Sequence, residues 1–134
     1  MLAGNNFAEI SFVKAFLHDS FKIKDLGNLR YFLGIEVVRS SKGILINQRK
    51  YTLELLEESG QLATKPSKTP YDPSLKLNCP DSPIYKDETQ YKRLIGRLLY
   101  LTTTRPDISF VVQQLSQHVS KSQVVHFKVV IRVL

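Results

Sequence analysis

The sequence predicts an α+β fold in which a helix and a β-hairpin precede a mostly helical lobe. Residues 6–20 repeat apolar side chains at helical spacing. Residues 29–46 are rich in β-branched and aromatic side chains and are divided by a turn, which indicates two strands. Helical spacing returns over residues 91–119, after a proline-rich stretch. The fold class follows from this change of period along the chain.

The amino-terminal helix is predicted over residues 6–20. Asn5 or Asn6 can cap it, because a short amide side chain accepts hydrogen bonds from the free amides of a first helical turn. Glu9 then lies where a carboxylate favours the positive end of the helix dipole. Apolar residues follow three or four positions apart, at Ile10, Val13, Leu17 and Phe21.

The β-hairpin is predicted from a strand over residues 29–38 and a second strand over residues 44–46, joined by a turn at residues 40–43. Gly34 interrupts the first strand. A glycine inside a strand marks a bulge or a place where another backbone or a ligand comes close, and the sequence leaves both open.

A short helix over residues 51–56 is expected to stop at Gly60, a favourable residue after a helix end. Proline fixes φ, lacks an amide donor and pushes the preceding residue toward an extended conformation. We therefore predict an extended connector over residues 61–86, because five prolines lie within it: Pro66, Pro70, Pro73, Pro80 and Pro83.

Residues 87–134 are predicted to be mostly helical. One apolar stripe consists of Leu94, Ile95, Leu98, Leu99 and Leu101. Pro106 suits the first turn of a second helix, with Asp107 favourably placed against its dipole. That helix would turn Ile108, Val111, Val112 and Leu115 inward. Residues 122–134 are rich in β-branched side chains, whose propensity favours a strand.

Positive charge is concentrated in the second half of the chain. The 134 residues carry a net charge of +7, and residues 91–134 hold seven basic residues against the single acid Asp107. Such a surface suits a polyanion, because bound Lys and Arg displace the counterions condensed on phosphates. A solvated basic face that aids solubility explains the same bias equally well.

Several classes of protein are excluded. Cys79 is the single cysteine and cannot form an internal disulfide. The sequence contains no run of about 18 apolar residues, the length needed to cross a membrane. The three histidines lie on separate segments, and no Gly-rich phosphate loop or nucleophile elbow is present. We therefore expect no catalytic residue, no metal site and no cofactor in this chain.

Several separate motifs resemble one family in order and spacing. They are the string Leu33–Val37, the pattern Gly43-Ile44-x-Ile46-x-Gln48-x-x-Tyr51-x-x-x-Leu55-Leu56, the pair Thr69-Pro70, the string around Tyr91–Leu101, and Thr104–Phe110 with Leu115-Ser116. Together they resemble the reverse transcriptase, an RNA-directed DNA polymerase, of copia-type retrotransposons, in particular the carboxy-terminal palm and thumb of a plant Gag-Pol-like polyprotein. The resemblance covers essentially the whole chain and implies a helix over residues 122–134.

This resemblance implies a division of the chain and of the chemistry. Residues 1–60 would be the end of the palm with a primer-grip-like hairpin, residues 61–86 the connector, and residues 87–134 a thumb-like segment. In the family a Tyr-x-Asp-Asp turn, whose carboxylates bind Mg²⁺, precedes a segment similar to residues 2–4, and an RNase H domain follows. We therefore expect a truncated fragment that holds template–primer but lacks the catalytic Asp pair, and whose partners include the missing palm, fingers and RNase H segments.

Six residues are the candidates for nucleic-acid contact that the resemblance implies: Phe32, Leu33, Gly34, Arg93, Arg97 and Arg105. The alternatives for them are a simple bulge at Gly34 and a solvated helix face at the arginines. For the whole chain, two further hypotheses stay open, a stand-alone basic nucleic-acid-binding module and a non-functional relic of a mobile element. A plant nuclear, cytoplasmic or mitochondrial location is equally compatible with the sequence.

Overall fold

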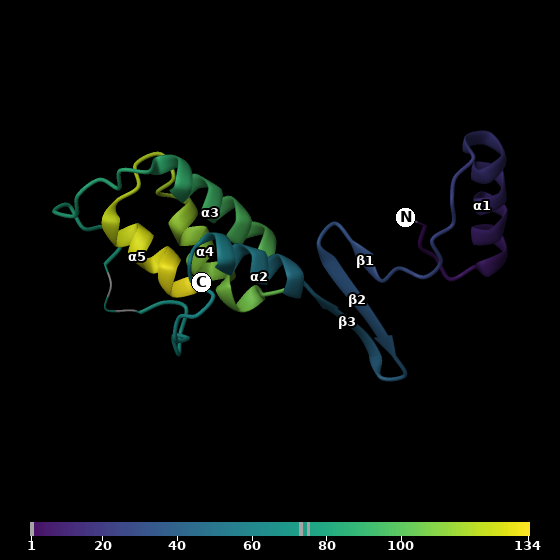
Figure 1. Cartoon of the computed structure of the whole chain (residues 1–134), viewed down its shortest axis with the longest axis horizontal. Coiled ribbons are helices and arrows are strands. Elements are labelled where there is room, and N and C mark those ends of the chain that lie inside the picture. Colours follow the sequence, from purple (N-terminus) through teal and green to yellow (C-terminus); the bar gives the residue numbers. More distant parts are fainter. Residues whose placement is uncertain (1, 73, 75) are drawn as a thin grey trace.

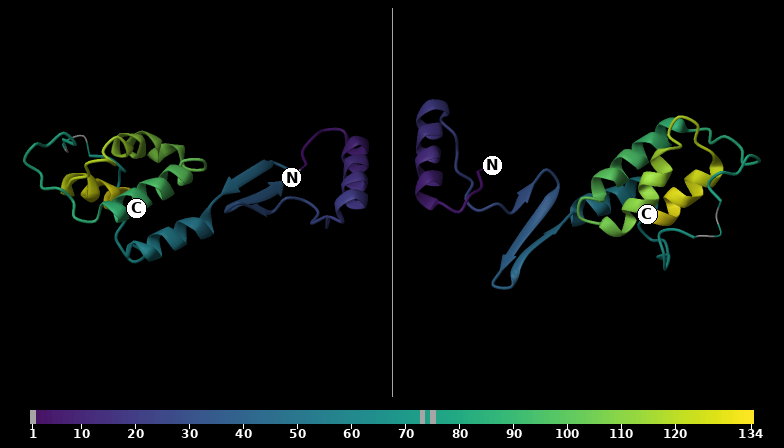
Figure 2. Two further views of the ribbon diagram at one scale, coloured as in Figure 1. Left: turned by 90° about the horizontal axis from the view of Figure 1, so that it is seen from above. Right: turned by 180° about the vertical axis from the view of Figure 1, so that it is seen from behind.

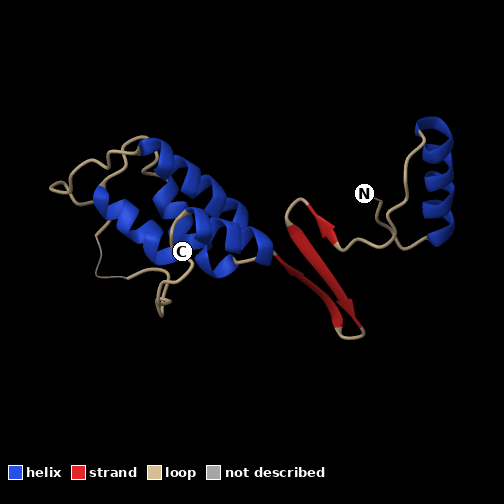
Figure 3. Cartoon of the chain, viewed as in Figure 1, coloured by secondary structure: helices blue, strands red, loops and turns tan. Residues whose placement is uncertain are grey.

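The chain is arranged as a separate helix, a small sheet and a helical lobe, placed one after another (Figure 1). The computed structural model describes residues 2–72, 74 and 76–134, so Pro73 of the predicted connector lies outside the described residues. Helices and one antiparallel sheet occur in separate parts of the chain, as Figure 3 shows by colour. The predicted α+β class is confirmed.

Helix α1, Phe7–Phe21, confirms the predicted amino-terminal helix and its cap. The Asn6 side chain accepts hydrogen bonds from the amides of Ala8 and Glu9, at 3.1 and 3.3 Å. The helix buries no side chain, and all views show it apart from the rest of the chain (Figure 2). Its exposed phenylalanines are Phe7, Phe12, Phe16 and Phe21. The segment after α1 contacts it through the ion pair of Lys14 with Asp25 and the hydrogen bond between His18 and the Ile23 carbonyl.

The sheet contains three antiparallel strands in the order β1-β2-β3. Strand β1 is Tyr31–Phe32, β2 is Ile35–Ser40 and β3 is Gly43–Asn47. The second predicted strand and its turn are confirmed. The prediction of one continuous strand over residues 29–38 is wrong, because the chain reverses at Leu33 and Gly34, where φ is positive at both residues. A β-strand requires negative φ, so the strand is divided there.

The helical lobe contains the core. It consists of α2, Arg49–Glu58, α3, Glu88–Leu101, the 3₁₀ turn η1, Pro106–Ile108, α4, Ser109–Ser116, and α5, Val124–Val133. Its buried apolar side chains come from four helices and the turn: Leu55, Tyr91, Leu94, Ile95, Leu98, Leu101, Ile108, Val111, Val112, Leu115, Val129 and Val130. The predicted inward residues are therefore confirmed except Leu99, which is 44% exposed because it falls beside the buried stripe of α3, whose members are Tyr91, Leu94, Ile95, Leu98 and Leu101.

Helix α5 confirms the helix that the family resemblance implies for residues 122–134. Its β-branched side chains have low helix propensity, but packing against the other helices stabilises the helix. Val129 and Val130 are fully buried against the other helices. The first turn is closed by reciprocal hydrogen bonds between Gln123 and His126, which satisfy amides that a helix start leaves free.

The segment between α2 and α3 forms no helix and no regular strand among its described residues, 61–72, 74 and 76–86. It returns along the helical lobe (Figure 2). Ile84 pairs with Gln123 in a single antiparallel bridge, and the Tyr85 ring stacks on Phe127 with centroids 4.1 Å apart. The extended segment is therefore attached to the core by a few aromatic and backbone contacts.

Candidate nucleic-acid interface

The turn between β1 and β2 has an unusual backbone. Phe32 pairs directly with Ile35, so Leu33 and Gly34 alone form the turn. Their φ angles are 49° and 78°, the left-handed region that type I′ hairpin turns use at both central positions. Gly34 adopts this conformation freely, whereas Leu33 adopts it at a steric cost and is 72% exposed. The turn therefore presents its backbone and one apolar side chain outward.

Tyr100 attaches this turn to α3. Its hydroxyl donates a hydrogen bond to the Leu33 carbonyl, across 67 positions of the sequence. A Cβ atom on Gly34 would lie 3.7 Å from the Tyr100 ring, an ordinary contact distance. Gly34 is thus required by its positive φ and not by lack of space. The structure places Gly34 in a two-residue turn beside the Tyr100 side chain. Its close approach to a nucleic-acid backbone stays a prediction.

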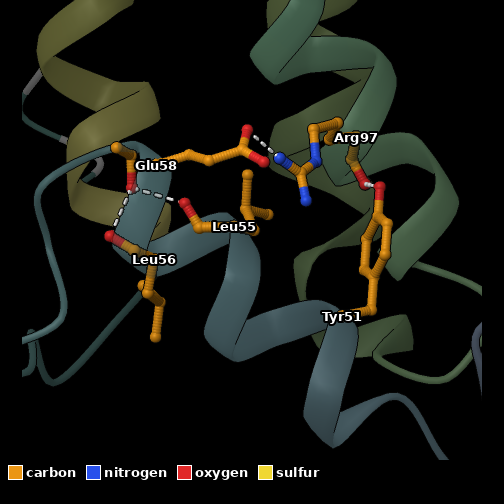
Figure 4. A network of polar contacts seen from close by, with 6 residues as sticks. Tyr51, Leu55, Leu56, Glu58 and Arg97 are labelled. Atoms are coloured by element: carbon orange, nitrogen blue, oxygen red, sulfur yellow. Dashed lines mark hydrogen bonds and ion pairs between the residues drawn. The ribbon is translucent and has the colours of Figure 1, made fainter.

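Arg97, one turn before Tyr100 on α3, connects α3 to α2. Its guanidinium forms an ion pair with Glu58 and lies 5.1 Å from the centroid of the Tyr51 ring. The Tyr51 hydroxyl donates to the Arg97 carbonyl at 3.1 Å. Figure 4 shows Arg97 between Glu58 and Tyr51. Burial lowers the pKa of Arg97, but the contacts with Tyr51 and Glu58 outweigh it and raise the pKa overall.

Tyr51 also contacts Tyr100, the residue that holds the hairpin turn. The rings of Tyr51 and Tyr100 meet edge to face, with centroids 5.1 Å apart. Glu58, Arg97, Tyr51 and Tyr100 therefore form one continuous set of contacts from α2 to the turn at Leu33. We call these four residues the junction cluster. It fixes the hairpin turn beside α3.

The remaining predicted arginines differ in their surroundings. Arg93 is exposed on α3 and forms no ion pair with any residue that the structure describes. Arg105 follows α3 and binds Asp107 through two hydrogen bonds, Nε to Oδ1 at 2.9 Å and Nη2 to Oδ2 at 2.7 Å. The hydrogen bond from Arg105 lowers the pKa of the Asp107 carboxyl. Arg93 therefore offers the most available charge on α3.

The structure brings part of the predicted set together. Leu33 and Gly34 lie against Tyr100, on the helix that carries Arg93 and Arg97. Arg105 instead lines a separate cavity, described below. Sequence reasoning missed Tyr100 and Glu58 as the residues that connect these elements. Tyr100 stands in a motif of the family resemblance, but nothing local in the sequence indicates that its partner is Leu33.

Within the described residues, no helix is long and apolar enough to cross a membrane, and no three acidic, histidine or cysteine side chains gather as a metal site.

Comparison with known proteins decides the family. The model of the family "Reverse transcriptase (RNA-dependent DNA polymerase)" matches residues 1–73, more than half of the chain. This chain belongs to the reverse transcriptase family. The match includes α1, the whole sheet and α2, so the hairpin turn at Leu33 and Gly34 belongs to the part that the family model covers.

Two of the relatives are retrovirus-related Pol polyproteins of transposons. The chain is 37% identical over its full length to the retrovirus-related Pol polyprotein from transposon RE2 of Arabidopsis thaliana, and 40% identical over 88% of its length to that from transposon RE1 of the same plant. It spans 9% and 8% of those two proteins. It is also 36% identical to an uncharacterized mitochondrial protein of the same plant, of which it spans 55%. No solved structure matches the chain.

Proposed function

We propose that this chain is the part of a retrotransposon reverse transcriptase that holds the template–primer duplex, without adding nucleotides by itself. The observation that carries the proposal is the Tyr100 hydrogen bond to Leu33. It places the hairpin turn, the counterpart of a primer grip by resemblance, beside the basic helix α3. A duplex held by both elements would contact two surfaces whose relative position the junction cluster fixes.

The charge distribution supports a phosphate-binding role. Residues 91–134 carry a net charge of +6, and the exposed Arg93 lies on the helix to which the hairpin turn is attached. Contacts to phosphates position a nucleic acid without reading its bases. Such contacts suit an element that must hold any primer end.

Nucleotide addition is assigned in this proposal to another part of a longer protein. The sequence contains no Tyr-x-Asp-Asp string, in which the family resemblance places the carboxylates for Mg²⁺. Two-metal catalysis needs such ligands to activate the primer hydroxyl and to stabilise the leaving oxygen. Mg²⁺ is therefore proposed as a cofactor of the intact enzyme.

The exposed phenylalanines on both sides of α1 support a protein partner. Phe7, Phe12, Phe16 and Phe21 are each more than 60% exposed, and Phe12 and Phe16 lie one helical turn apart. Large exposed apolar surfaces of this kind mark contacts with other protein segments. We include in the proposal that α1 packs against further polymerase segments of a polyprotein of the relatives' kind.

Binding to a fluorescent primer–template duplex tests the proposal. It is measured by fluorescence anisotropy at several salt concentrations. Arg93→Ala is the informative variant, because the removal of Arg97 would also break its ion pair with Glu58. A lost phosphate contact should weaken binding by at most about fivefold and reduce the salt slope by about one. Lys128→Ala is the matched control, since Lys128 is exposed on α5 and carries the same charge.

Equal effects of the Arg93 and Lys128 substitutions would indicate a diffuse basic surface and contradict the proposed position of the duplex. Primer extension by this chain with Mg²⁺ would contradict the assignment of catalysis to another segment.

A second candidate, a basic nucleic-acid-binding module, is favoured by one observation. The helical lobe has its own core and carries all seven basic residues of the 91–134 segment. In that case duplex affinity would not depend on the hairpin. Leu33→Ser separates the two functions, because it changes the exposed turn and leaves the lobe intact.

A further inference from the structure

A cavity of about 240 Å³ lies where the sheet meets the helical lobe. The segment Ile46–Arg49, in which β3 passes into α2, forms one side, and Thr104 with Arg105 forms the other. Ligand pockets for drug-sized molecules are larger, from about 300 Å³ upward. The cavity therefore suits a single small group.

Gln48 is the unusual residue of this cavity. Its side chain is buried, with 2% of the residue exposed. Its Oε1 accepts a hydrogen bond from the Thr104 hydroxyl at 2.8 Å, while its buried Nε2 has no partner among the described residues. Buried polar atoms are almost always hydrogen-bonded, because an unmade hydrogen bond costs the full desolvation of the group. An Nε2 donor in this position calls for an acceptor that enters the cavity.

The surrounding charges indicate that the acceptor is an anion. Two of the lining residues, Arg49 and Arg105, are basic, and none is acidic. The cavity also lies at the first turn of α2, where the helix dipole favours negative charge. The Arg49 amide in this turn already donates a hydrogen bond to Asn47 Oδ1 at 3.2 Å. Gln48 is the N-cap residue of this helix, but its side chain makes no capping hydrogen bond.

Two carboxylates lie near the cavity without lining it. Asp107 binds Arg105 through Nε and Nη2, which leaves the Nη1 hydrogens of Arg105 for other acceptors. Glu36 accepts a hydrogen bond from the Lys50 amide at 3.3 Å. Arg49 has no acidic partner among the described residues, so it contributes its full charge.

We propose that this cavity is a phosphate-binding site, in which Gln48 Nε2 and Arg49 donate hydrogen bonds to the phosphate oxygens. The phosphate belongs to a nucleic-acid backbone, a detail that rests on the proposed function, or to a free phosphate-bearing small molecule. Either source provides the same tetrahedral acceptor group. The site would add a contact at the opposite end of α2 from the ion pair between Arg97 and Glu58.

A titration with inorganic phosphate tests the site alone. The readout is the backbone amide signals of Arg49 and Thr52 in nuclear magnetic resonance spectra. The expected result is a saturable shift that an equal ionic strength of chloride does not produce. Gln48→Met keeps the side-chain length and removes the donor, and it should weaken phosphate binding about tenfold. Gln113→Met, an exposed position on α4, is the matched control.

Arg49→Ala provides a test that leaves the buried Gln48 in place, with Arg39→Ala as the control of equal charge, exposed on β2. Only Arg49→Ala should weaken phosphate binding. Shifts that do not saturate, or that persist unchanged in Gln48→Met and Arg49→Ala, would overturn the inference.

Duplex binding, measured with the same variants, distinguishes the two sources of the phosphate. If Gln48→Met weakens both phosphate and duplex binding, the phosphate is that of a nucleic acid. Saturable phosphate binding without any duplex binding would support the site for a small molecule and contradict the proposed function. Duplex binding that depends on Arg93 but not on Gln48, without phosphate shifts, would overturn this inference and leave the proposed function in place.

Discussion

The hydrogen bond between Tyr100 and the turn at Leu33 leads to the most direct test of the hairpin's position. Tyr100→Phe removes only the hydroxyl that donates to the Leu33 carbonyl. A hydrogen bond contributes about 0.5–1.5 kcal/mol net, and the exposed position of Leu33 lets water replace the lost donor. We therefore expect the lower part of that range, about 0.5–1 kcal/mol. This free energy corresponds to about a two- to fivefold shift toward detachment of the turn.

Hydrogen exchange at the amides of β1 and β2 measures this detachment, and duplex affinity measures its consequence. Exchange at the hairpin should become about two- to fivefold faster, and duplex affinity should fall by no more than the same factor. The free energy of unfolding of the helical lobe should change little, because the Tyr100 ring remains in contact with Tyr51. Tyr31→Phe is the matched control, since Tyr31 lies in the same hairpin and its hydroxyl has no hydrogen-bond partner among the described residues.

Equal exchange rates in Tyr100→Phe and in the unmodified chain would refute the argument that this contact holds the turn. Faster exchange with unchanged duplex affinity would show that the turn is attached by Tyr100 but is not used to hold a duplex.

Two further predictions concern backbone conformation and pH. Gly34→Ala should destabilise the hairpin by about 1–2 kcal/mol, because φ is 78° at this position and an L-residue is strained there; faster exchange confined to the hairpin amides would confirm it. Burial is the main cause that lowers the pKa of His126 below 6.5, and its Nδ1 already accepts from the Gln123 amide at 3.0 Å. The unfolded chain then binds more protons, so the free energy of unfolding should fall as the pH drops below 6.5, by at most about 1.4 kcal/mol per pH unit. Chemical denaturation of His126→Gln between pH 5 and 7 checks this origin. The free energy of unfolding of the variant should change less with pH than that of the unmodified chain.

The candidate site was predictable only in part. The hairpin residues and α3 follow as candidates from the family resemblance, and Gly34 stands out by its place in a strand-like sequence, where the structure has a positive φ. The contacts of Arg97 could not be predicted from the sequence, because its partners Glu58 and Tyr51 lie on a helix about 40 positions away. Gln48 shows the same limit: its amide becomes significant only because folding buries it beside Thr104. The predicted boundaries of the three parts, residues 1–60, 61–86 and 87–134, stay predictions, although Leu55 of α2 lies in the core of the lobe.

By itself the sequence determined the local elements, since capping by Asn6, turn chemistry and apolar spacing act between residues that are near in the chain. Those same local rules misjudged the strand at residues 29–38 and favoured a strand where α5 forms. Tertiary structure alone decided these cases, because Tyr100 holds the turn at Leu33 from 67 positions away, and the buried Val129 and Val130 gain more from packing than β-propensity costs them. Contacts between distant residues form only after the chain has been brought together, so no window of the sequence contains them.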